Sequence, residues 1–288
     1  MTDHGRVGSS DSLPVACRRA IAHVAALAAG QPVDPSLRVT LNFHPDRPAG
    51  PMLTLEAVAR DGLYRSQFET GTSNGGLTAH PGGDRWSWER RIFGKAYDEA
   101  PAQQRPKYGA LNFRRLRIGG SPRFGSAHLR LREQTLLRTT FCYPDSVFEP
   151  TQFGVASRMS LIELAEADNR DPLDGYIEAQ VHGPLLLDRD VEALVLDPCF
   201  RNTNVERAAN TLPCPVEWHA GFRLNIEELQ RHPHYRGSRY VELGCVLAQD
   251  GHIDPKIIGD AARTGQYEEQ ALKRVWHYLA RFGAPRPR

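Results

Sequence analysis

Residues 176–197 read YIEAQVHGPLLLDRDVEALVLD, and this stretch contains the clearest pair of strands in the chain. YIEAQVHGPLLL (176–187) and VEALVLD (191–197) are both typical of strands, and the polar LDRD joins them. Side chains alternate between the two faces of a strand, so the first strand has one apolar and one polar face. The polar face fits the wall of a cleft, and it equally fits a solvent-facing strand of an antiparallel sheet. The polar face carries Tyr176, Glu178, Gln180 and His182.

Outward from this pair, short strands and helices alternate irregularly along the chain. Segment 85–98 fits either a strand or a short helix. Because there is no steady strand–helix–strand alternation, the order favours an α+β fold with antiparallel sheets. Further strands are predicted at 38–43, 63–70, 107–113, 127–132, 139–143 and 239–247. Helices are predicted at 13–29, 54–62, 155–169 and 267–282.

Composition and charge exclude several classes of protein. The 288 residues are 40% hydrophobic and 24% charged, which is typical of a globular chain with a sizeable core. A net charge of +2 gives no global field toward DNA or a membrane. The five cysteines are scattered without a CxxC pair, which favours a reducing compartment over a zinc site or disulfide framework.

The same sequence predicts where the protein works. No apolar stretch approaches the length that spans a bilayer, so no membrane association is expected. The first residues, MTDHGRVGSSDS, lack the charged and apolar regions of a secretory signal. We therefore expect a cytoplasmic protein, or one delivered into a host or target cell without a classical signal peptide.

FHPDR (43–47) follows the first predicted strand, where side chains project into a cleft edge. His44 or Arg47 could hold a hydroxyl or phosphate of a ligand, since imidazole titrates near neutral pH and guanidinium forms paired hydrogen bonds. A structural alternative is a turn in which Asp46 pairs with Arg47.

Two further segments concentrate polar side chains near glycines. The loop ETGTSNGGLTAHPGG (69–83) offers hydroxyls and backbone N–H groups that can surround a phosphate, although it equally fits a flexible surface loop. RPKYGALN (105–112) and GGSPRFGS (119–126) lie beside predicted strands, and stacking on Tyr108 or Phe124 with Arg123 on a phosphate would suit a dinucleotide.

The blocks LNFHPDR, RPKYGALN, GGSPRFGS and YIEAQVHGPL resemble an uncharacterised bacterial domain family. More distantly, the order of features is similar to the ADP-ribosyltransferase superfamily. That superfamily places His or Arg after a first strand, then a helix and strand, a polar middle segment, and a Glu on a late strand. Here His44 and Arg47, TLEAVARDGLYRS (54–66), GTSNGG (71–76) and Glu178 stand in those places.

The second resemblance implies a fold and a division of the chain. It implies two small, mostly antiparallel sheets that form an NAD-binding cleft with flanking helices. It divides the chain into a tail and helix (1–36), a catalytic core (37–210) and a C-terminal α/β extension packed on the core (211–288).

The resemblance also implies a function, namely an NAD-dependent mono-ADP-ribosyltransferase or NAD glycohydrolase of the effector or toxin type. NAD is the substrate, no metal is needed, and the acceptor is an unknown protein or nucleic acid. Glu178 stabilises the transition state, His44 binds the adenosine ribose and Gln180 orients the acceptor. The cofactor-binding residues are Arg47, Thr72, Ser73, Asn74, Gly75, Tyr108, Ser121, Arg123 and Ser126.

Two alternative functions stay open at this stage. Carboxylate and imidazole groups suit divalent cations, so a metal-dependent hydrolase or nuclease is one alternative. The other is a non-enzymatic interaction module whose aromatic C-terminal segment binds a partner. The candidate metal ligands are His44, Asp46, His128, Glu178 and His182.

Overall fold

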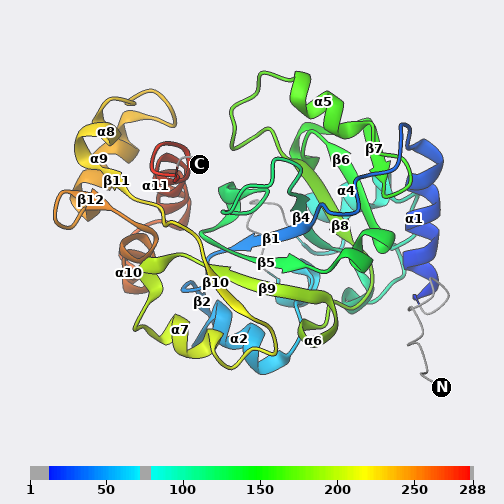
Figure 1. Ribbon diagram of the computed structural model, residues 1–288, viewed down its shortest axis with the longest axis horizontal. Coiled ribbons are helices and arrows are strands. Elements are labelled where there is room, and N and C mark those ends of the chain that lie inside the picture. Colours follow the sequence, from blue (N-terminus) through cyan, green and yellow to red (C-terminus); the bar gives the residue numbers. More distant parts are fainter. Residues whose placement is uncertain (1–12, 72–78, 286–288) are drawn as a thin grey trace.

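The computed structural model describes residues 13–71 and 79–285, and its centre is an eight-stranded sheet (Figure 1). Neighbouring strands are antiparallel except for one parallel pair at the edge, β9 and β10. Across the sheet the order is β10 (Val216–Trp218), β9 (Val191–Leu196), β5 (Ala127–Leu131), β1 (Val39–Phe43), β4 (Lys107–Leu111), β8 (Ile177–Val181), β6 (Thr139–Tyr143) and β7 (Gln152–Val155). Two small sheets pair β2 (Pro48–Ala49) with β3 (Met52–Leu53) and β11 (Leu224–Asn225) with β12 (His252–Ile253).

The helices lie around this sheet, with the last four gathered at one end of the molecule and the first at the opposite end (Figure 1). Within the described ranges, no helix is both long and apolar enough to cross a membrane. The helices are α1 (Val15–Leu27), α2 (Thr54–Asp61), α3 (Gln67–Thr70), α4 (Asp84–Ile92), α5 (Leu161–Ala167), α6 (Leu187–Asp190), α7 (Asn204–Ala209), α8 (Ile226–Gln230), α9 (Ser238–Leu247), α10 (Pro255–Thr264) and α11 (Glu269–Phe282).

The predicted α+β class is confirmed, but the strands of the central region do not divide into two small sheets. They join one large sheet because β1 pairs with β5 along one edge and with β4 along the other. The strands on both sides are thereby hydrogen-bonded into one continuous array.

Three local predictions change in the structure. Segment 63–70 contains helix α3 in place of a strand, because Ser66 and Glu69 form reciprocal capping hydrogen bonds around its first turn. Segment 239–247 is helix α9, whose buried Val241, Gly244 and Leu247 recur at helical spacing. The undecided segment 85–98 begins as helix α4, and the helix predicted over 155–169 is shorter, beginning only at Leu161.

The two faces of the sheet differ in character. On one face, alternate side chains such as Leu41, Leu129 and Ile177 form the main hydrophobic core with α2, α5 and α7. The opposite face carries polar side chains, and α1 and α4 cover it over β6 and β7. The C-terminal helices form a separate hydrophobic cluster that includes Ile118 and Leu173. The polar face of the sheet therefore lies between the main core and the apolar residues of α1 and α4.

Candidate functional site

A cavity of about 80 Å³ lies on the polar face of the sheet, over β1, β4 and β8. The rest of its wall comes from helices α3 and α4, from Tyr64 and Tyr176, and from the 3₁₀ turns at Pro122–Phe124 (η3) and Ser146–Phe148 (η5) with the residues that cap them. The residues that line it are Asn42, Tyr64, Gln67, Arg85, Tyr108, Gly109, Ser121, Arg123, Phe124, Asp145, Ser146, Val147, Tyr176 and Glu178.

Glu178 is the carboxylate at the centre of this site. Strand β8 is bonded on both sides, to β4 and β6, so the position of this side chain is rigid. Its Oε2 accepts hydrogen bonds from the Ser146 hydroxyl (3.0 Å) and backbone N–H (3.4 Å). Burial raises the pKa of Glu178 to about 7; the Arg85 guanidinium opposes the rise and the Asp145 carboxylate adds to it. Such a carboxyl group changes its charge near neutral pH.

A chain of buried hydrogen bonds leads away from Glu178 along β8 and β6. The Gln180 amide donates to Glu178 Oε1 (3.1 Å) and accepts from the Thr140 hydroxyl (2.8 Å). The Thr140 hydroxyl lies 2.9 Å from His182 Nε2, and the Tyr97 hydroxyl lies 2.6 Å from His182 Nδ1. Burial lowers the pKa of His182 to about 3, so the imidazole is neutral. With Tyr97 donating to Nδ1 and Nε2–H donating to Thr140, every donor in the chain points toward Glu178.

Arg85 and Tyr108 form the wall next to Glu178. The Arg85 guanidinium lies 4.1 Å from the centre of the Tyr108 ring, a cation–π contact. The Tyr108 hydroxyl donates to Glu89 (2.6 Å), and Glu89 forms a buried ion pair with Arg105 (2.6 Å). Helix α4 supplies both Arg85 and Glu89, so it determines the position of the Tyr108 ring.

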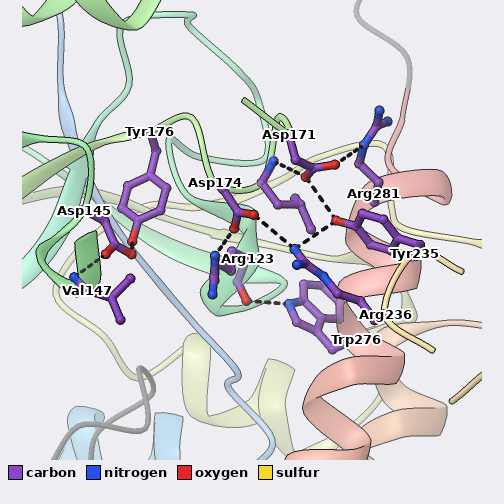
Figure 2. Close-up of polar contacts among 11 residues, drawn as sticks. Arg123, Asp145, Val147, Asp171, Asp174, Tyr176, Tyr235, Arg236, Trp276 and Arg281 are labelled. Atoms are coloured by element: carbon purple, nitrogen blue, oxygen red, sulfur yellow. Dashed lines mark hydrogen bonds and ion pairs between the residues drawn. The ribbon is translucent and has the colours of Figure 1, made fainter. Parts of the chain in front are cut away.

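A second carboxylate, Asp145, lines the cavity beyond Ser146. It accepts a hydrogen bond from the Val147 backbone N–H (2.7 Å), which caps η5, and another from the Tyr176 hydroxyl (Figure 2). Both contacts come from its own loop and from the residue just before β8. Asp145 is therefore oriented by the fold, and it adds negative charge near Glu178.

Four buried polar atoms of the lining have no hydrogen-bond partner among the described residues. Two are guanidinium nitrogens, one is a hydroxyl oxygen and one is an amide oxygen. Because buried polar groups are nearly always hydrogen-bonded, their convergence on one cavity indicates a site for a polar ligand. The atoms are Arg85 Nε, Arg123 Nε, Ser121 Oγ and Gln67 Oε1.

The structure brings together four of the residues that the sequence indicated: Glu178, Tyr108, Ser121 and Arg123 all line the cavity. Gln180 lies behind Glu178, fully buried, and touches it without lining the cavity. The predicted residues Thr72, Ser73, Asn74 and Gly75 lie outside the described residues.

The other predicted residues lie elsewhere. The His44 ring packs against Trp276 of α11, with ring centres 4.8 Å apart. The carboxylates of Asp46 and Glu269 act electrostatically on the Arg47 guanidinium. The Asp46 backbone carbonyl accepts a hydrogen bond from Arg263 of α10 (3.0 Å). The FHPDR segment thus joins the end of β1 to the C-terminal helices and does not line the cavity.

Ser126 is fully buried just before β5. Its carbonyl lies 2.8 Å from His219 Nε2, and its side chain does not line the cavity. The five candidate metal ligands are likewise spread over the structure. Within residues 13–71 and 79–285, no group of three or more His, Cys, Asp or Glu side chains is arranged to hold an ion.

Sequence reasoning missed several residues of the site. Asp145 and Ser146 lie just past the predicted strand 139–143, after Pro144, in a position typical of functional side chains, so this signal was available. Arg85 lies in the segment that fitted either a strand or a helix. Its role depends on α4 crossing the polar face, which no local pattern encodes.

Comparison with known proteins places the chain in a family but assigns it no activity. A family model described as "Protein of unknown function (DUF3626)" matches residues 38–165 and 156–282, which together span most of the chain. No curated protein matches it. The resemblance to an uncharacterised domain family is thereby confirmed, and these comparisons contain nothing on ADP-ribosyltransferases.

Proposed function

The chain belongs to the DUF3626 family, whose function is unknown, and we propose from its cavity that it is an NAD-dependent enzyme acting through Glu178. The reaction is cleavage of the bond between nicotinamide and ribose, with transfer of ADP-ribose to an acceptor or to water. One observation carries the proposal: a buried carboxylate with a pKa near 7 in a cavity whose lining offers unpartnered polar atoms.

The chemistry requires a negative charge close to the ribose. As the glycosidic bond breaks, nicotinamide leaves with the bonding electron pair, and positive charge develops on the ribose. An oriented carboxylate stabilises that charge and accepts a hydrogen bond from a ribose hydroxyl, and the acceptor then forms the new bond at the same carbon. Glu178 is suited to this role because Ser146 and Gln180 orient its two oxygens.

The rest of the lining supports a nucleoside ligand. The Tyr108 and Tyr176 rings supply aromatic surface, and Ser121 supplies a hydroxyl without a partner among the described residues. A cavity of about 80 Å³ is smaller than the roughly 150 Å³ cavity that holds benzene, so it takes only part of a nucleoside. We therefore propose that only part of the nicotinamide riboside end enters, while the phosphates lie toward Arg123.

The test measures nicotinamide release from NAD by the full-length protein, without divalent metal and then with it. We expect metal-independent release that falls about 10²–10³-fold in Glu178→Gln, the usual loss when one preorganised group is removed. Asp188→Asn, at an exposed residue of α6, is the matched control and should keep the wild-type rate.

Three outcomes would count against the proposal. Release at the wild-type rate by Glu178→Gln would show that another residue acts. Release only with added metal would favour the metal-dependent hydrolase. If the protein neither releases nicotinamide nor binds NAD, the result would favour the interaction module.

A further inference from the structure

A cluster of basic side chains lies beside the cavity, where η3 meets α11. It consists of Arg123, Arg236, Lys273 and His277, and we call it the basic seam. Lys273 and His277 are four residues apart on α11 and so share one side of that helix. The positive charges of Arg123, Arg236 and Lys273 all lower the pKa of His277, after the larger effect of burial, so the four groups lie close together.

The basic seam contains more positive than negative charge. Asp174 forms an ion pair with Arg123 and another with Arg236 (3.3 Å), so one carboxylate serves two guanidinium groups (Figure 2). Lys273 has no ion pair among the described residues. Burial, together with the neighbouring Arg123 and Arg274 charges, lowers the pKa of Lys273 to about 8. An anion at this place would relieve the repulsion among these cations.

The basic seam also contains buried nitrogens without hydrogen-bond partners among the described residues, and because the lowered pKa of His277 leaves its imidazole neutral, one of its two ring nitrogens is a donor and the other an acceptor. Arg123 Nε, Arg236 Nε and both ring nitrogens of His277 are buried and lack hydrogen-bond partners within the described part of the chain. The His277 side chain is fully buried. Arg123 and Arg236 share the Asp174 carboxylate. Their charges and that of Lys273 act on His277. Guanidinium and ammonium groups offer several N–H donors, which match the acceptor oxygens of a phosphate.

We infer that the basic seam is a phosphate-binding subsite, which takes the phosphate or pyrophosphate of a ligand whose other end occupies the cavity. The two places are contiguous: Arg123 belongs to both, and the Asp145 carboxylate, which lines the cavity, raises the pKa of Lys273. Identifying the group as the pyrophosphate of NAD rests on the proposed function, whereas phosphate binding itself does not.

The test titrates the full-length protein with inorganic pyrophosphate by isothermal calorimetry, beside Lys273→Met and Lys273→Arg. We expect wild type and Lys273→Arg to bind, and Lys273→Met to bind about tenfold more weakly, a loss of roughly 1.4 kcal/mol. Lys273 is the residue to change because no ion pair within the described residues is lost with it. Arg231→Gln, an exposed charge at the end of α8, is the control and should bind like wild type.

The outcomes separate the subsite from the proposed function. If wild type does not bind pyrophosphate, or Lys273→Met binds it as tightly as wild type does, the subsite is wrong, even if NAD is cleaved. If pyrophosphate binds with the expected loss in Lys273→Met but NAD is neither bound nor cleaved, the subsite stands and the NAD assignment fails. Thermal melting of each variant checks that it is folded.

Discussion

At the scale of single residues, Glu178 shows how burial prepares a side chain for chemistry. Its carboxylate is removed from water, and two hydrogen-bonding side chains and one nearby guanidinium only partly offset the loss of hydration. Burying the charged carboxylate lowers the folding stability of the protein, yet the same charge interacts strongly with a ligand bound in the low-dielectric cavity. The cost is measurable without any substrate.

The raised pKa of Glu178 predicts a pH-dependent stability. Because its folded pKa of about 7 exceeds the ordinary 4.5, the folded chain retains a proton that the unfolded chain releases. The stability associated with this group is therefore greatest below pH 4.5, is lost as pH rises toward 7, and is level above that. Glu178→Gln has no such loss, so its stability relative to wild type should rise by about 2–3 kcal/mol between pH 5 and pH 8.

Urea unfolding of both proteins at the two pH values measures this difference. Contributions from other titrating groups cancel in the comparison. An equal difference at pH 5 and pH 8 would mean that the carboxyl of Glu178 titrates normally.

At the scale of elements, strand β8 owes its two characters to simple alternation. Ile177, Ala179 and Val181 enter the main core, while Glu178 and Gln180 face the opposite layer. Away from the cavity, polar groups of that layer satisfy one another, as in the chain from Tyr97 to Glu178, and this offsets the cost of burying them.

This hydrogen-bond chain predicts a large effect of one hydroxyl group. Thr140→Val leaves the Gln180 carbonyl and His182 Nε2 buried without their partner, which should cost about 2–4 kcal/mol of unfolding free energy. Thr140→Ser keeps the hydroxyl and is the matched control, with an expected loss of about 1 kcal/mol for the methyl group. Similar denaturant midpoints for the two variants would show that the chain adds little stability.

At the scale of the whole molecule, the loop before β8 joins the sheet to the C-terminal helices. Asp171 accepts hydrogen bonds from Tyr235 and Arg281 (both 3.0 Å), while Asp174 pairs with Arg123 and Arg236 (Figure 2). This contact positions α11 beside the cavity, so the C-terminal segment contributes to the candidate site although the cavity itself lies on the sheet.

Asp174→Asn should loosen this junction. Both arginines lose their carboxylate in a half-buried place, and we expect a loss of about 1–3 kcal/mol, less than for a fully buried pair. Asp260→Asn removes an ion-paired carboxylate on α10 that is more exposed than Asp174 (35% against 17%), and it should cost under about 1 kcal/mol. Urea unfolding measures both losses, and limited proteolysis should cleave the C-terminal helices faster in Asp174→Asn alone. Equal losses in the two variants would contradict the role given to Asp174.

Local pattern was sufficient for much of the architecture. Helical periodicity identified the elements that became α1, α2 and α11, and alternation identified β1, β4, β5, β6, β8 and β9. Both signals arise within a few residues, because each element repeats at its own period. The same alternation placed Glu178 and Gln180 on one face of β8. Dense polar residues beside glycines indicated Tyr108, Ser121 and Arg123, which the fold brings into one cavity with Glu178.

Long-range contacts decided the rest. Contacts between residues far apart in the chain place β1 between β4 and β5 and place α4 over the polar face. They also pack the His44 ring against Trp276 and away from the cavity. Segment 239–247 looked like a strand in isolation, yet it packs as helix α9 against α8 and α11. Apolar side chains favour burial without specifying a partner, since the hydrophobic effect is not directional. Only the assembled fold determines which surfaces meet, and therefore which polar groups converge.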